Sequence, residues 1–270
     1  TVEQFESHLE FIAEGDYTVA PLLDIIETLQ SGGTLADKTL AITIDDAYLS
    51  VYLEAWPRLK EYGFPFTVFI ATDPVDNGIK SYMNWDQIRE LQENGVTIGS
   101  QTKSHPHMHR LSPIEVEQEI ELSNNRFLEE IGQYPQLFAY PFGEYSLNVI
   151  RAVKDAGFIA AFGQNSGVLF ASDDMFELPR FAFNENYGSI DRLKLALDGK
   201  PLRVSDITPQ DMVLTDNPPS FGFTVDDMLT PISQLRCFSS EYGQLSVQIL
   251  GPRAEIRLPG AVKGPRTRIN

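Results

Sequence analysis

Short apolar runs alternate with amphipathic stretches through the first 200 residues, and this alternation constrains the possible fold most strongly. Residues 40–45, 65–72 and 96–101 form runs of strand length that are rich in apolar and small side chains. Such runs are typical of parallel strands that are buried on both faces. Because helical stretches separate the runs, we expect right-handed crossovers and either a (β/α) barrel or a doubly wound sheet.

Residue patterns that mark the starts of helices support the same α/β assignment. Thr1-Val-Glu-Gln4 and Ser112-Pro-Ile-Glu115 both have the pattern of a capping box, which marks the start of a helix. Two further strands are expected at residues 136–141 and 158–162. In either architecture the functional side chains should gather where the strands end, at the carboxyl edge of the sheet.

The composition changes near Gly199. Beyond it, Pro, Gly, Ser and β-branched residues dominate, and residues 235–238, 245–250 and 254–258 have the pattern of short strands between turns. We therefore expect an α/β domain at residues 1–200 and a small β-rich unit at residues 205–270. The β-rich unit ends in a strand-like register, which suggests a truncated chain.

The charge balance excludes some classes of partner. The chain has 38 acidic and 21 basic side chains and a formal net charge of -17. A nucleic-acid-binding protein needs a basic face, so we expect no nucleic acid partner. The acidic surplus lies in residues 1–200, where it either serves solubility or attracts cationic ligands such as amino sugars. The sequence has no apolar run long enough for a transmembrane helix.

Candidate chemistry follows three of the expected strands. Asp45 and Asp46 come at the end of the run at residues 40–45, where a turning chain could bring both carboxylates to one site. Three histidines, His105, His107 and His109, follow the strand at residues 96–101, and imidazole is a common metal ligand. The segment Ala139-Tyr-Pro-Phe-Gly-Glu-Tyr145 follows the next strand and could form an aromatic wall for a sugar.

Together these segments resemble the polysaccharide deacetylases, the nodulation-protein-B-like carbohydrate esterases. That family has a Thr-Phe-Asp-Asp-Gly motif, a His-Thr-x-x-His-Pro motif and a Pro-Tyr-Gly-type motif. The corresponding segments here are Thr43-Ile-Asp-Asp-Ala47, Gln101-Thr-Lys-Ser-His-Pro106 and Tyr140-Pro-Phe-Gly143. The resemblance covers about residues 1–198 and implies a distorted (β/α) barrel whose first strand would precede Thr1.

The resemblance also implies roles for individual residues. Asp45 would be the catalytic base, and Asp46, His105 and Gln101 would hold a divalent metal ion, with zinc as the expected metal. An ion with open positions polarises a carbonyl group and acidifies a bound water. The implied reaction is removal of N-acetyl groups from an amino-sugar glycan. The residues expected to contact substrate are Tyr140, Pro141, Phe142, Gly143 and Trp85.

The chain departs from the family pattern at several positions. Gln101 replaces a metal-binding histidine, and its amide oxygen suits hard cations better than zinc. His107 or His109 could replace the missing imidazole. Ala139 stands where many members have an arginine that orients the base, and Ala47 replaces the glycine of the first motif. The late Leu-x-His motif, which supplies the family's general acid, has no counterpart.

These departures leave three functional hypotheses open. The first is a metal-dependent N-deacetylase, and the second is a catalytically impaired carbohydrate-binding or scaffold protein on the same barrel. The third is a glycosidase with Asp45 and Glu144 as its carboxylate pair. The resemblance alone implies a periplasmic or extracellular location.

Overall fold

The computed structural model describes residues 1–226 and 232–270, and the chain divides into two compact units. Unit 1 is Thr1–Gly199 and unit 2 is Lys200–Asn270. The β-rich segment expected at residues 205–270 falls within unit 2, but residues 227–231 lie outside the described residues. Among the described residues, no helix combines the length and the apolar character required to cross a bilayer.

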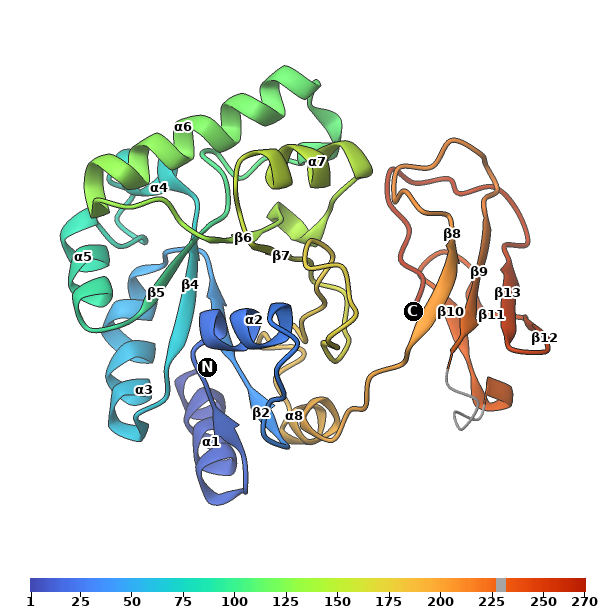
Figure 1. Cartoon of the computed structure of the whole chain (residues 1–270), viewed down its shortest axis with the longest axis horizontal. Coiled ribbons are helices and arrows are strands. Elements are labelled where there is room, and N and C mark those ends of the chain that lie inside the picture. The colour runs from blue at the N-terminus through green and yellow to red at the C-terminus, as the bar shows by residue number, and fades with distance from the viewer. Residues whose placement is uncertain (227–231) are drawn as a thin grey trace. The chain divides into compact units, whose positions relative to one another are not determined.

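Five parallel strands form the centre of unit 1 and lie side by side in chain order (Figure 1). They are β3 (Ile42–Asp45), β4 (Phe66–Ile70), β5 (Thr97–Ser100), β6 (Leu137–Ala139) and β7 (Ala160–Phe162). The strand order does not reverse, as it would in a doubly wound sheet, and the sheet curls into a half-barrel. The predicted α/β class of the barrel type is therefore confirmed. Two short strands, β1 (Thr18–Val19) and β2 (Thr39–Leu40), form a separate parallel pair.

Strand register brings the ends of these strands to one edge of the sheet. Asp45 pairs with Phe69, Ile70 with Ser100, and Ala139 with Phe162. We call this edge, with the loops that leave it, the carboxyl edge. All three segments that carry candidate chemistry follow strands that end there, as the sequence predicted.

Helices connect the strands and cover the sheet (Figure 1). Their bounds are α1 (Val2–Glu14), α2 (Leu22–Gln30), α3 (Trp56–Tyr62), α4 (Thr72–Asp76), α5 (Trp85–Glu93), α6 (Pro113–Ile131), α7 (Leu147–Asp155) and α8 (Ile190–Leu197). A π-helical turn, Val51–Ala55, leads into α3, and Met108–Arg110, Pro141–Gly143 and Ile232–Gln234 are 3₁₀ turns. The predicted capping boxes at Thr1 and Ser112 are both present.

Strand β4 shows how the sheet is buried on both faces. Val68 and Ile70 pack in one apolar cluster, which includes Phe127 of α6. Phe69 points the other way and packs against Ile26 of α2 and against strands β6 and β7. Each fully buried side chain of this size contributes about 1.5–3 kcal/mol of burial free energy. Burial on both faces explains why the sequence run is continuously apolar rather than alternating.

Unit 2 is built from antiparallel strands. A four-stranded sheet has the order β12 (Val247–Leu250), β13 (Arg253–Arg257), β9 (Ser220–Val225) and β8 (Val204–Thr208), and β10 (Cys237–Ser239) pairs with β11 (Gly243–Leu245). The run at residues 245–250 was expected as one strand, but the chain breaks at Ser246 because β11 and β12 pair in different sheets. Strands β8 and β9 were not expected from the sequence.

Candidate functional site

The first two carboxylates of the site come from the end of β3. Asp45 is the last residue of the strand, and Asp46 follows with a left-handed backbone, φ 61°. Asp tolerates this conformation better than most residues because its short polar side chain can bond locally. The turn at Asp46 interrupts the alternation of a regular strand, which allows both carboxylates to serve the carboxyl edge.

Asp45 is held by an arginine that the sequence analysis missed. Arg180 Nη1 donates to Asp45 Oδ1 at 2.6 Å, and Arg180 Nη2 donates to Oδ2 at 3.0 Å. Gln164 Nε2 donates to Oδ2 at 3.2 Å. A two-pronged arginine–carboxylate pair fixes the plane of the carboxylate as well as its position. Asp45 is therefore oriented from two directions.

Arg180 is itself anchored. Its Nε donates to the carbonyl oxygen of Gly163 at 2.9 Å, and its Nη1 reaches Thr43 Oγ1 at 3.2 Å. Its guanidinium also lies over the ring of Phe69, 5.3 Å from the centroid. Ala139, where many family members have an arginine, is completely buried in the sheet. Arg180 supplies the same contact from the segment that follows β7, and no sequence motif marks it.

Asp46 and His105 form the second part of the site. His105 Nε2 lies 3.8 Å from Asp46 Oδ1, although the residues come from different strand ends. Burial raises the pKa of the Asp46 carboxyl, the nearby His105 lowers it, and the negative charge of Asp45 raises it. The backbone N–H of His105 donates to Thr102 Oγ1 at 3.0 Å, which fixes the loop that carries the imidazole. The structure therefore brings together two of the predicted metal ligands.

Gln101 is the third predicted metal ligand, and its side chain is almost fully buried, 1% exposed. Its backbone N–H donates to Ile70 O at 2.9 Å, which continues the pairing of β4 and β5 by one residue. Within the described residues, its side-chain oxygen Oε1 has no hydrogen-bond partner. A buried acceptor without a partner costs about 1–3 kcal/mol, so this oxygen has a lone pair for a cation or a water. Its amide oxygen, like the carboxylate of Asp46 and the imidazole of His105, is a type of donor that a divalent ion accepts.

The loop after β6 contains most of the residues predicted to contact substrate. Phe142 is exposed and has a left-handed backbone, φ 60°. Gly143 also has positive φ, 68°, and a Cβ there would meet Gln164 backbone at 2.6 Å. Gln164 is the residue that donates to Asp45, so Gly143 permits a close approach of the two loops.

Three of the predicted substrate contacts need correction. Tyr140 is fully buried and donates its hydroxyl to the carbonyl oxygen of Phe176 at 2.9 Å, and Pro141 is buried beside it. Trp85 belongs to the apolar core, where its indole Nε1 donates to Asp76 Oδ1 at 2.7 Å. Tyr140 has no exposed surface and Trp85 is only 8% exposed, so these side chains pack inside the protein rather than against a sugar.

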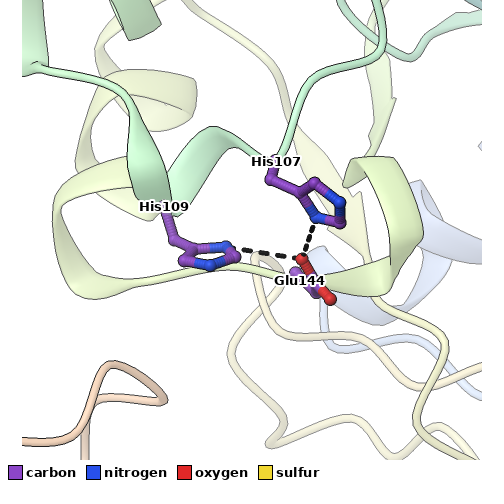
Figure 2. Close-up of side chains that lie close together, drawn as sticks. All are labelled: His107, His109 and Glu144. Carbon is purple, nitrogen blue, oxygen red and sulfur yellow. Dashed lines mark hydrogen bonds and ion pairs between the residues drawn. The ribbon is translucent and has the colours of Figure 1, made fainter. Parts of the chain in front are cut away.

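His107 and His109 do not replace the missing imidazole at position 101. Both rings approach the carboxylate of Glu144 instead (Figure 2). The glycosidase hypothesis requires Glu144 to face Asp45. Glu144 contacts the two histidines, whereas Asp45 contacts Arg180. The two carboxylates therefore have separate partners.

Comparisons with known proteins agree with this geometry. The sequence profile of the polysaccharide deacetylase family matches residues 32–161. The Bacillus subtilis (strain 168) protein YxkH, whose name places it among polysaccharide deacetylases, is 25% identical over 178 residues, which cover 66% of this chain and 63% of that protein. The poly-beta-1,6-N-acetyl-D-glucosamine N-deacetylase of Staphylococcus aureus (strain MRSA252) is 25% identical over 199 residues, covering 68% of this chain and 67% of that protein.

Solved structures show the same fold. The Streptococcus pyogenes deacetylase PplD in complex with acetate has a TM-score of 0.68 and 21% identity, covering 73% of this chain and 87% of that one. IcaB from Ammonifex degensii has a TM-score of 0.65 and 20% identity, covering 73% and 89%. The profile match lies within unit 1. It includes the whole of β3, β4, β5 and β6 and stops within β7. Residues 32–161 of unit 1 therefore match the polysaccharide deacetylase family, and unit 1 has the fold of the solved deacetylase structures.

Proposed function

We propose that unit 1 hydrolyses N-acetyl groups on an amino-sugar polysaccharide or oligosaccharide with the help of a divalent metal ion. The observation that carries the proposal is Asp45, which Arg180 holds at the carboxyl edge beside the Asp46–His105 pair. One carboxylate is thus fixed for proton transfer, and a second carboxylate with an imidazole is placed to bind an ion. The match to the polysaccharide deacetylase family over residues 32–161 and the substrate named for the Staphylococcus aureus relative support the glycan class.

Asp45 acts as the general base. Its Oδ2 accepts hydrogen bonds from Arg180 and Gln164, whereas Oδ1 accepts one from Arg180. Each carboxylate oxygen has two lone pairs, so Oδ1 keeps one for the proton of the attacking water. The water oxygen bonds to the acetyl carbon, the carbon–nitrogen bond breaks, and Asp45 returns its proton to the leaving nitrogen. The products are a free amine and acetate.

Asp46, His105 and Gln101 would hold the metal. When bound, a divalent ion polarises the acetyl carbonyl and lowers the pKa of a water. Two of the three donors are oxygens, a set that suits zinc less well than two imidazoles would and also admits harder cations such as manganese. Loading the protein with either metal before the assay therefore tests the identity of the ion.

The test is acetate release from N-acetylglucosamine oligomers by protein loaded with zinc, cobalt or manganese. Asp45→Asn should lower turnover by about 10²–10⁴-fold, the usual contribution of a general base. Asp155→Asn is a matched control, because Asp155 is exposed at the end of α7. Equal turnover of Asp45→Asn and the unchanged protein would refute the assignment. Oligomer binding without acetate release under any metal would instead favour a binding protein.

We also propose that the protein acts in the periplasm or outside the cell, where polymeric amino-sugar glycans are found. The resemblance to the deacetylase family is the support for this location. Fractionation of source cells, followed by immunodetection of the full-length protein, tests it. Detection in the cytoplasmic fraction alone would contradict the proposal.

A further inference from the structure

Two histidines and a glutamate meet beside the proposed catalytic edge. His107 Nδ1 lies 2.6 Å from Glu144 Oε2, and His109 Nδ1 lies 3.4 Å from the same oxygen (Figure 2). One potential ligand atom from each of the three residues lies within 4.8 Å of the others. The histidines come from the loop after β5, and the glutamate comes from the loop after β6.

We propose that His107, His109 and Glu144 bind a divalent transition-metal ion, such as zinc, at a site separate from the Asp46–His105 pair. Zinc bonds to imidazole nitrogen and carboxylate oxygen at about 2.0–2.2 Å, so tetrahedral ligands lie about 3.4 Å apart. The His109–Glu144 separation already has this value. The His107–Glu144 separation needs to open by less than ~1 Å. Three protein ligands leave a fourth position for water.

The protein backbone presents the two imidazoles in a fixed arrangement. His107 and His109 flank Met108, whose side chain is completely buried in the apolar cluster beneath the loop. The carbonyl oxygen of His107 accepts a bond from the backbone N–H of Arg110 at 2.9 Å, which closes the turn. Because the middle residue is anchored, the residues on either side keep their places without an ion.

Glu144 is fixed in a similar way. Its backbone N–H donates to the carbonyl oxygen of Pro141 at 3.1 Å, within a tight turn. Its side chain is 13% exposed, whereas those of His107 and His109 are 36% and 22% exposed. The carboxylate is therefore mostly shielded from water, and the imidazoles leave a route by which an ion can enter.

The ring of Phe142 separates this site from the Asp46–His105 pair. It stacks on His107, with centroids 4.0 Å apart and an interplanar angle of 17°, and meets His105 edge-on at 4.6 Å. An ion on the His107 side would link the loop after β5 to the loop after β6 and hold Phe142 against His105. The site does not depend on the proposed deacetylation.

Zinc binding by the purified full chain tests the proposal, with zinc chloride as the probe in calorimetry and elemental analysis of dialysed protein. Asp46→Asn disables the neighbouring pair and should still bind one zinc ion per chain. Adding His109→Gln or Glu144→Gln to Asp46→Asn should weaken this binding by at least ~100-fold, because loss of even an outer-shell partner costs 10–100-fold. His8→Gln is the matched control, since His8 instead contacts the carbonyl oxygen of Gly188 at 2.8 Å.

Cobalt provides a second measurement that reports the ligands directly. The visible absorption of bound Co²⁺ should be present in Asp46→Asn and absent from Asp46→Asn/His109→Gln, with circular dichroism used to confirm that both variants are folded. Two results would overturn the proposal. One is Asp46→Asn protein that binds no zinc, and the other is zinc binding that is the same with and without His109→Gln and Glu144→Gln.

Discussion

The ion pair of Arg180 and Asp45 should stabilise unit 1 as well as orient the proposed base. The side chains are only 12% and 25% exposed. Removing one partner from a fully buried pair costs about 3–5 kcal/mol, because the other charge is left without compensation. Allowing for the remaining solvent exposure, we expect Arg180→Met to lower the free energy of unfolding of unit 1 by about 2–3 kcal/mol.

Tryptophan fluorescence during urea unfolding measures this loss in unit 1 alone. The chain has two tryptophans, Trp56 and Trp85, and both lie in unit 1. A double-mutant cycle with Asp45→Asn isolates the interaction from the other bonds that Arg180 makes. Arg180→Lys keeps the charge but not the paired donors, so it should recover only part of the loss.

The expected coupling energy between positions 45 and 180 is at least ~1.5 kcal/mol, the lower range for hydrogen bonds to charged groups. A coupling below about 0.5 kcal/mol would place the pair among ordinary surface salt bridges. That result would refute the argument that this contact fixes Asp45. In the same variants the base should lose its orientation, which should lower the rate of acetate release. The loss should appear as a lower kcat, with KM little changed.

Three other changes test separate parts of the structure. Tyr48 lies two residues after Asp46 in the loop that leaves the carboxyl edge, is 42% exposed and packs on Tyr82 with centroids 4.7 Å apart, so we expect its ring to contact the glycan. Tyr48→Ala should then raise KM for oligosaccharides without a large loss of stability. Burial raises the pKa of the Cys237 thiol, so iodoacetamide should label it slowly at pH 8 until unit 2 unfolds, as mass spectrometry would show. Because the pKa of this thiol in the folded protein lies above its ordinary value of 9.0, its contribution to stability is present below that pH and is lost as the pH rises above it. Gln101→His should raise zinc affinity about 10- to 100-fold in calorimetry, roughly 1.4–2.7 kcal/mol.

Local patterns predicted the strands and helices of unit 1 because burial on both faces of a parallel sheet leaves a continuous apolar run. The same patterns placed Asp45, Asp46 and His105 at strand ends, where register then brings them together. Tertiary packing decided the rest. Arg180 lies 135 residues from Asp45 in sequence, and no local pattern links the two.

Two aromatic residues that the sequence assigns to the substrate site lie in the core. Tyr140 lies within the segment that follows the strand at residues 136–141, and Trp85 starts the helix α5; an amphipathic aromatic side chain at either position is compatible with a substrate wall or a core position. Each has its polar atom satisfied inside the protein, by Phe176 and Asp76, and this is visible only in three dimensions. Sequence spacing gave no means of distinguishing the two environments.

Backbone strain gathers at the carboxyl edge. Of the six non-glycine residues with positive φ among those described, Asp46, Thr102, His105 and Phe142 all lie in the loops that leave this edge. Such conformations cost of order 1–3 kcal/mol each and persist only where the surroundings determine them. Buried neighbours such as Met108 and Tyr140 supply that constraint from beneath the loops. The packing that excludes Tyr140 from contact with substrate therefore holds the site residues in conformations that they would not adopt alone.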